Sequence, residues 1–170
     1  DYPLEDISYT CQWLEHALAE LKNLDIEQRL RGIDEDILGA YFFNRQRIEI
    51  YWASIGIFAA RLGVSVEGLT VVTLAHELAH AYTHLGKDID SVVWDTQRFA
   101  ESDVHLVEGM AQFYTRAICR KLAGRFPAAL QAFEALLKLQ SEPYNHFGEW
   151  VKEHPHQGEV VRFSMIQCRS

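Results

Sequence analysis

The sequence has little that would support a disulfide scaffold, a cysteine metal site or a membrane span. Its three cysteines, Cys11, Cys119 and Cys168, lie far apart, are odd in number and never stand in C-x-x-C spacing. This usage favours buried thiols in a reducing compartment over a disulfide framework or a cysteine zinc site. No apolar run approaches the ~20 residues that cross a bilayer. We therefore expect no membrane partner.

The chain also lacks a basic face, because its net charge is −8 and its like charges form no runs. Nucleic acids and anionic membranes attract basic surfaces, so we expect no nucleic-acid partner. With 170 residues and no repeat, linker or low-complexity tract, a single domain over residues 1–170 is expected. No signal peptide is visible, which favours a cytoplasmic protein, and the start at Asp1 without Met leaves open that the chain is a fragment.

Hydrophobic periodicity predicts an α+β fold that is mostly helical, with a small β-sheet before a histidine-rich helix. Steps of three and four between apolar residues predict a helix over 7–21, and I-E-Q-R-L-R suggests a second, short one over 26–31. Residues 37–43 and 47–52 are rich in aromatic and β-branched residues and predict two strands joined by a polar turn. Cap residues predict further helices over 53–62, 66–85, 103–122 and 127–140; residues 87–98 favour a loop or short strand, and 158–168 a strand or helix.

The stretch T-L-A-H-E-L-A-H-A-Y-T-H, residues 73–84, carries the strongest functional motif. On a helix His76 and His80 lie one turn apart on one face, so both can bind one zinc ion. Glu77 lies about 100° round the helix and can act as a general base on a water, which is the H-E-x-x-H arrangement. A bound cation would also compensate the burial of these groups in an otherwise apolar helix.

The third metal ligand is not part of this stretch. A third histidine in the pattern H-E-x-x-H-x-x-G-x-x-H requires Gly and His at positions that hold Thr83 and Gly86 here. His84 lies one turn beyond His80, and we interpret it as a residue that supports the ligands from outside or lies at the rim of the site.

The candidates for the third ligand lie downstream. They are Glu101, Asp103, His105 and Glu108. Glu108 is favoured because it stands in the apolar segment L-V-E-G-M-A-Q-F-Y, where small Gly109 and Ala111 let two helices pack closely. Glu101 remains the alternative, although A-E-S-D is polar and indicates a turn; Asp103 suits an N-cap or first-turn position.

The motif H-E-L-A-H followed by E-G-M-A-Q-F-Y resembles the gluzincin metallopeptidases, the thermolysin, aminopeptidase-N and minigluzincin families. The resemblance covers about residues 47–114 and implies a zincin-like minimal catalytic domain with one zinc per chain, held by His76, His80 and Glu108. Glu77 would be the general base in the hydrolysis of a peptide or protein substrate. That substrate would pair with the segment 47–52 by strand addition. The spacing to Glu101 is closer to that in thermolysin-like enzymes. Gln112 stands where those enzymes carry an aspartate that holds a zinc histidine.

A donor for the oxyanion is implied by the same resemblance but is fixed by no motif. Tyr144 and His146, in P-Y-N-H-F-G-E-W, are the favoured catalytic candidates, with Tyr114 as a further option and Arg162 as a group for a substrate carboxylate. The alternative function is a catalytically silent or regulatory zincin-fold domain that binds a peptide or partner protein. The presence of Glu77 favours catalysis, and the acidic charge disfavours a DNA-linked protease of the SprT-like group.

Overall fold

The computed structural model describes residues 38–86, 92–150, 152 and 156–169. The chain divides into two units, Asp1–Glu35 and Asp36–Ser170, and every described residue belongs to the second. The helices expected over 7–21 and 26–31 therefore lie outside the described residues. The single domain over 1–170 stays a prediction for the same reason.

The described part begins with an antiparallel hairpin. Strand β1 (Gly39–Phe42) pairs with β2 (Arg47–Ile50), and the register runs from Gly39 opposite Ile50 to Phe42 opposite Arg47. The turn between them contains Gln46 at a positive φ of 49°. The two predicted strands and their turn are confirmed. The second strand is shorter than expected, because Trp52 is exposed and already begins a helix.

Four longer helices begin and end near the predicted residues, and their caps explain why. Ser65 is the N-cap of α4 (Val66–Leu85), because its side chain accepts a hydrogen bond from the N–H of Gly68 at 2.9 Å; the helix ends at Gly86. Gly63 closes the first helix in the left-handed conformation, with φ at 66°. The four helices are α3 (Trp52–Leu62), α4 (Val66–Leu85), α6 (Val104–Leu122) and α7 (Pro127–Leu137).

The shorter elements depart from the sequence-based expectations. Within the segment expected as loop or strand, Asp95 caps a short helix by accepting hydrogen bonds from the N–H groups of Gln97 and Arg98. A helix of five residues has too few positions to show periodicity, so the pattern could not reveal it. The tail, expected to be irregular, forms two short helices, and the strand-or-helix alternative for 158–168 is settled as helix. These elements are α5 (Thr96–Ala100), α8 (Glu142–Asn145), α9 (Phe147–Trp150) and α10 (Gln157–Arg169).

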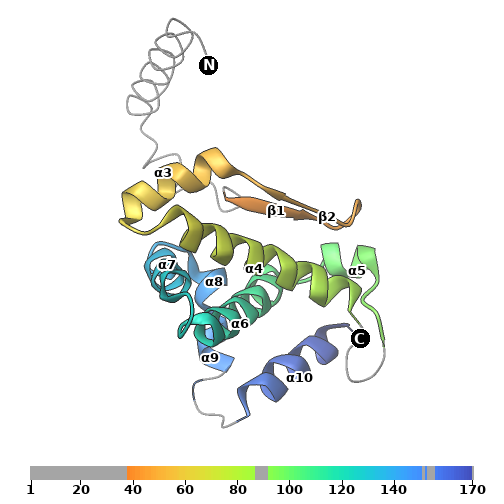
Figure 1. Cartoon of the computed structure of the whole chain (residues 1–170). Helices are drawn as coiled ribbons and strands as arrows, with labels where there is room; N and C mark the ends of the chain where they lie inside the picture. The colour runs from red at the N-terminus through yellow and green to blue at the C-terminus, as the bar shows by residue number, and fades with distance from the viewer. Residues whose placement is uncertain (1–37, 87–91, 151, 153–155, 170) are drawn as a thin grey trace, which may run out of the picture. The chain divides into compact units, whose positions relative to one another are not determined.

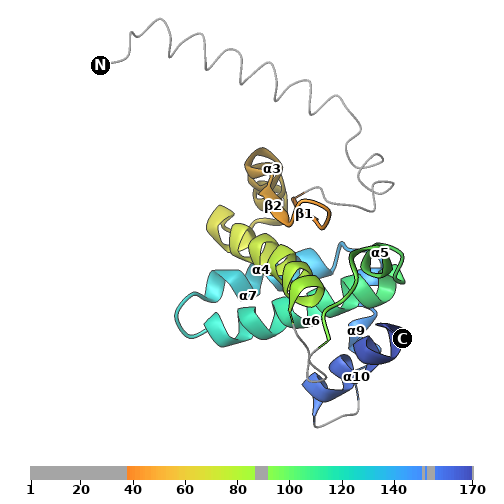
Figure 2. The same cartoon turned by 90° about the vertical axis from the view of Figure 1, so that its right-hand side faces the viewer.

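Helix α4 is the centre of the described fold. The hairpin and α3 pack along one side of it, and α6 and α7 pack along the other (Figures 1 and 2). Gly68 permits close packing with α7, because a Cβ there would lie 2.6 Å from the carbonyl oxygen of Ala128. The fold is therefore mostly helical with a small sheet before α4, as predicted.

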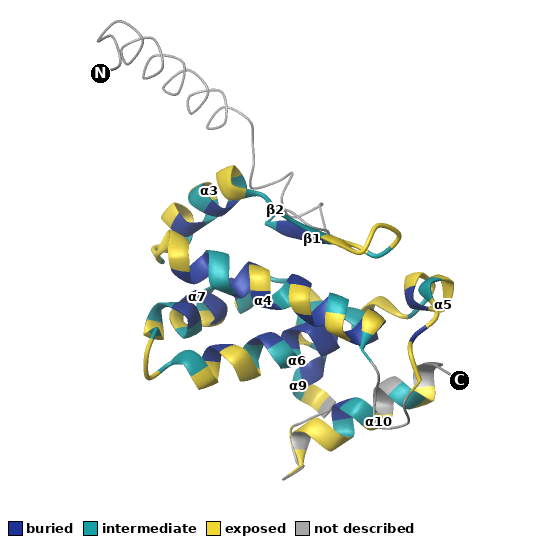
Figure 3. Ribbon diagram, turned by 45° about the vertical axis from the view of Figure 1, so that its right-hand side comes forward, coloured by how far each residue is buried: buried dark blue, intermediate teal, exposed yellow. Residues whose placement is uncertain are grey.

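The hydrophobic core lies between α4 and the elements that pack against it. The buried residues of α4 lie on the sides of the helix that these elements cover (Figure 3). Cys119 is a buried free thiol, as expected, and burial raises the pKa of this thiol to about 11. None of the helices within the described ranges combines the length and the apolar character needed to cross a membrane. The largest fully buried side chains are those of Ile55, Leu69, His84, Met110, Gln112, Thr115, Cys119 and Val161.

Candidate metal centre

Three candidate ligands converge between α4 and α6. The Nε2 atoms of His76 and His80 lie 3.0 Å apart. Glu108 approaches both histidines, with Oε2 at 3.0 Å from Nε2 of His76 and Oε1 at 3.5 Å from Nε2 of His80. Within the described residues, these three form the group of histidine, cysteine and acidic side chains that could hold a metal ion. Two of the ligands come from one face of α4, and the packing of α6 against α4 supplies the third.

The short contacts within this group cannot all be hydrogen bonds. Nε2 of a neutral imidazole either carries one proton or offers one lone pair. If His76 donates to Glu108, it has no lone pair left for His80; if it accepts from His80, its nitrogen faces a carboxylate oxygen without a proton between them. A cation at the centre would satisfy all three side chains at once.

The dimensions also fit zinc. A tetrahedral site with ligand bonds of about 2.0–2.1 Å has ligand atoms about 3.3 Å apart, and the three contacts here measure 3.0, 3.0 and 3.5 Å. Two imidazoles and one carboxylate are a donor set that catalytic zinc takes, with a fourth position left open. The residues present therefore fit the ion that the motif implies.

Burial and charge give the candidate ligands the protonation states that a metal requires. Burial lowers the pKa of His76 below its ordinary value, and the contact with Glu108 only partly opposes this effect. For Glu108, burial alone would raise the pKa of the carboxyl, but the nearby His80 and His76 hold it well below its usual range. A neutral imidazole and a carboxylate are the forms that coordinate cations.

Glu77 follows His76 on α4 and is almost fully buried, with 4 % of its surface exposed. Strand β1 lies directly against this part of the helix. A Cβ added to Gly39 would come within 2.7 Å of Cγ2 of Thr73 and 3.3 Å of Cγ of Glu77. Glycine at this position therefore allows the hairpin to approach the glutamate that the motif assigns as general base.

The ring of Tyr144, one of the two oxyanion candidates, lies beside that of His76. Its centroid is 5.8 Å from that of His76. His146 lies at the end of the same short helix, where Nδ1 is 3.4 Å from Glu142 and 3.7 Å from Glu149. Tyr114 packs edge-on against Tyr82 at 5.6 Å between centroids. The catalytic role of each stays a prediction.

The rival candidates for the third ligand have other contacts. Glu101 is exposed and accepts a hydrogen bond from Nε2 of Gln97 at 2.9 Å. Asp103 is the N-cap of α6, where its carboxylate accepts from the N–H of His105 at 2.8 Å, so its N-cap role is confirmed. His105 lies between Asp103 and Glu142, a contact across 37 residues that no sequence pattern signals.

Gln112 donates from Nε2 to Oε1 of Gln140 at 2.6 Å, and a contact of its amide oxygen with a zinc histidine stays a prediction. The rim position expected for His84 is wrong, because this residue is 1 % exposed. It stacks on Phe99 at 4.9 Å between ring centroids.

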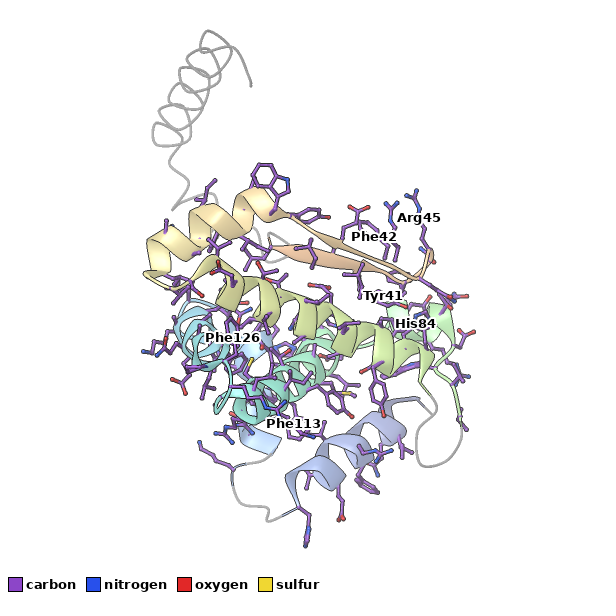
Figure 4. The ribbon with its side chains drawn as sticks, in the orientation of Figure 1. Tyr41, Phe42, Arg45, His84, Phe113 and Phe126 are labelled. Carbon is purple, nitrogen blue, oxygen red and sulfur yellow. The ribbon has the colours of Figure 1, made fainter. Side chains whose placement is uncertain are left out.

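His84 connects three elements of the fold. Nδ1 lies 2.9 Å from the hydroxyl of Tyr41 on β1 (Figure 4). Nε2 lies 3.0 Å from Oγ1 of Thr96 on α5. Burial lowers the pKa of His84, so the ring is neutral, and one of its nitrogens donates a hydrogen bond while the other accepts one. The residue fastens the hairpin and α5 to the end of α4.

Comparison with models of protein families, with curated proteins and with solved structures yields no significant match. Any function must therefore be argued from the motif and from the arrangement of its side chains.

Proposed function

We propose that the chain is a zinc-dependent peptidase with a zincin-like catalytic domain, in which one zinc ion is held by His76, His80 and Glu108. The observation that carries the proposal is the triangle of ligand atoms at 3.0–3.5 Å, which a cation satisfies and hydrogen bonds alone do not. When bound, zinc would polarise the scissile carbonyl and lower the pKa of a water towards ~7. A structural zinc site would commonly be closed by four protein ligands, whereas three favour a catalytic one.

Glu77 supplies the acid–base chemistry in this proposal. It stands on the same helical turn as His76, about 100° round, so it can reach a water beside the ion that the two histidines hold. Its carboxylate takes a proton from the attacking water and later returns that proton to the leaving amine. The side chain is almost fully buried, which keeps competing water away from the transfer.

The substrate in this proposal is an extended peptide that adds a strand to the hairpin through backbone hydrogen bonds. The sequence-based expectation assigned this role to the segment 47–52. The packing of Gly39 against Thr73 and Glu77 brings β1, the strand paired with residues 47–50, next to the proposed base. Tyr144, beside His76, is the proposed donor to the oxyanion.

A mixed peptide library tests the proposal when wild type is compared with Glu77→Gln. The variant should keep zinc but lose hydrolysis by roughly 10²-fold or more, because the amide cannot accept the proton. Glu67→Gln is the matched control: this exposed glutamate lies in the first turn of the same helix, and its variant should cleave like wild type.

Each other outcome has a defined meaning. Equal cleavage by Glu77→Gln would remove the base assignment. A wild-type chain that binds zinc but cleaves no peptide would support the alternative, a silent zincin-fold domain that binds a peptide or partner protein.

A further inference from the structure

The short helix α8 presents two faces with different neighbours. Glu142 and His146 are four residues apart and share one face. Tyr144 stands two residues after Glu142, about 200° round the helix, and its ring lies 5.8 Å from that of His76. A rotation or shift of α8 would therefore move Tyr144 relative to the candidate metal centre.

One side chain of α6 fastens the opposite face of α8. Nε2 of His105 lies 2.6 Å from Oε2 of Glu142, and Nδ1 of the same ring lies 3.1 Å from Oδ1 of Asp103. Because a carboxylate only accepts, both ring nitrogens of His105 must donate, and the ring is an imidazolium. Asp103 is itself fixed as the N-cap of α6, so the bridge leads from a rigid helix end to α8.

We propose that His105 is a positioning residue, whose bridge from Asp103 to Glu142 holds α8 against the start of α6 and so keeps Tyr144 beside His76. The inference rests on the proposed function, because Tyr144 is the donor assigned there to the oxyanion. His105 acts through α8: its hydrogen bonds and its ring contact are with Asp103, Glu142 and His146. Its effect is therefore expected on the reaction step and on the place of Tyr144, while zinc affinity stays unchanged.

The charges around His105 favour its cationic form. The contact with Glu142 raises the pKa of His105, and Asp103 adds to this effect. The other titratable groups of the cluster are His146, whose ring is 5.3 Å from that of His105, and Glu149, which faces His146. His105 therefore keeps its charge and its bridge to Glu142 when the pH is below its ordinary pKa of 6.5. It loses both as the pH rises through its raised pKa. Tyr144 should accordingly be released on the alkaline side.

The experiment compares His105→Gln with His105→Arg in the full, zinc-loaded chain. Glutamine removes the cation, whereas arginine keeps a permanent charge that can bridge two carboxylates. At 19.6 kDa the chain suits solution NMR, in which a through-space proton contact between the rings of Tyr144 and His76 reports their proximity without any substrate. The contact should be lost in His105→Gln, kept in His105→Arg, and weakened in wild type as the pH rises.

Activity supplies the second measurement. His105→Gln should lower kcat by roughly 10- to 100-fold with little change in KM, approaching the loss that Tyr144→Phe itself causes. In the Tyr144→Phe background, His105→Gln should cost almost nothing more, because the two residues act in series. His156→Gln, at an exposed histidine outside the cluster, is the matched control and should behave like wild type.

The two measurements separate failure of this inference from failure of the proposed function. The positioning role is refuted if the contact between the rings of Tyr144 and His76 persists in His105→Gln. It is also refuted if His105→Gln lowers kcat as much in the Tyr144→Phe background as in wild type. If the contact is lost as expected but the wild-type chain cleaves no peptide, His105 positions Tyr144 and the peptidase proposal is what fails.

Discussion

Replacing Gly39 by alanine should push the hairpin away from the candidate site. The added Cβ would lie 2.7 Å from Cγ2 of Thr73 and 3.0 Å from the backbone oxygen of Glu49. Carbon atoms pack at about 3.5–4.0 Å, so β1 and α4 must separate by about 1 Å locally. Thr73 cannot rotate away without losing the 3.0 Å hydrogen bond from its hydroxyl to the carbonyl of Leu69.

Overpacking of this kind typically costs about 1–3 kcal/mol. For a chain of this size, each kcal/mol lowers Tm by roughly 2–4 °C, so Gly39→Ala should melt about 2–12 °C below wild type. Hydrolysis should fall as well, since the same Cβ would lie 3.3 Å from Cγ of Glu77. Differential scanning calorimetry and peptide cleavage measure the two effects.

Gly56→Ala is the matched control for this substitution. It lies inside α3, and an added Cβ there meets nothing within 4 Å. Alanine should therefore stabilise the chain by up to about 1 kcal/mol through its higher helix propensity. Unchanged melting and unchanged cleavage in Gly39→Ala would show that this glycine does not fit β1 closely against Thr73 and Glu77.

Three further results are expected. In competition titrations, Glu108→Ala should weaken zinc binding by more than roughly 100-fold and Glu101→Ala by less than twofold. Replacing a residue that only hydrogen-bonds to a metal ligand already costs about 10–100-fold in metal affinity, so losing a ligand should cost more. The reverse order would reassign the third ligand. His84 is buried with a lowered pKa, so below about pH 6.5 the unfolded chain binds the proton that the folded chain resists, and stability falls. His84→Gln should therefore show a flatter decline of Tm between about pH 7 and pH 5 than wild type, and an equal slope would refute this assignment; His76 is retained in both. Cys119, with a pKa of about 11, should resist a thiol reagent at about pH 8 in the folded chain and react on unfolding, as read by peptide mass spectrometry.

The long helices could be predicted because their boundaries are coded locally. Ser65 and Asp103 each cap the helix that follows them, and Gly63 closes α3 at a positive φ. The hairpin likewise follows from two short β-prone segments with a polar turn. Helices of four or five residues, such as α5 and α8, cannot be predicted from hydrophobic periodicity because they are too short to show a period.

The sequence could predict those residues of the candidate site that share one helix or that stand as a polar residue in an apolar segment. His76 and His80 share a face by spacing alone, and Glu108 was favoured because an acidic residue in an apolar helix needs a partner. The roles of His84 and His105 depend on contacts with other elements, Tyr41 on β1 and Glu142 on α8. Such contacts between distant segments leave no periodicity in the sequence.

X-ray absorption at the zinc edge, on the purified full chain after equimolar zinc is added, shows whether His76, His80 and Glu108 hold the ion. We expect one tightly bound zinc per chain, with a shell of nitrogen and oxygen ligands at about 2.0–2.2 Å and the scattering of two imidazoles. Glu108→Ala should lose this signal, and Glu101→Ala should keep it. A folded chain that binds no zinc, or a zinc shell with sulfur at about 2.3 Å, would show that these three residues are not the ligands of a zinc ion.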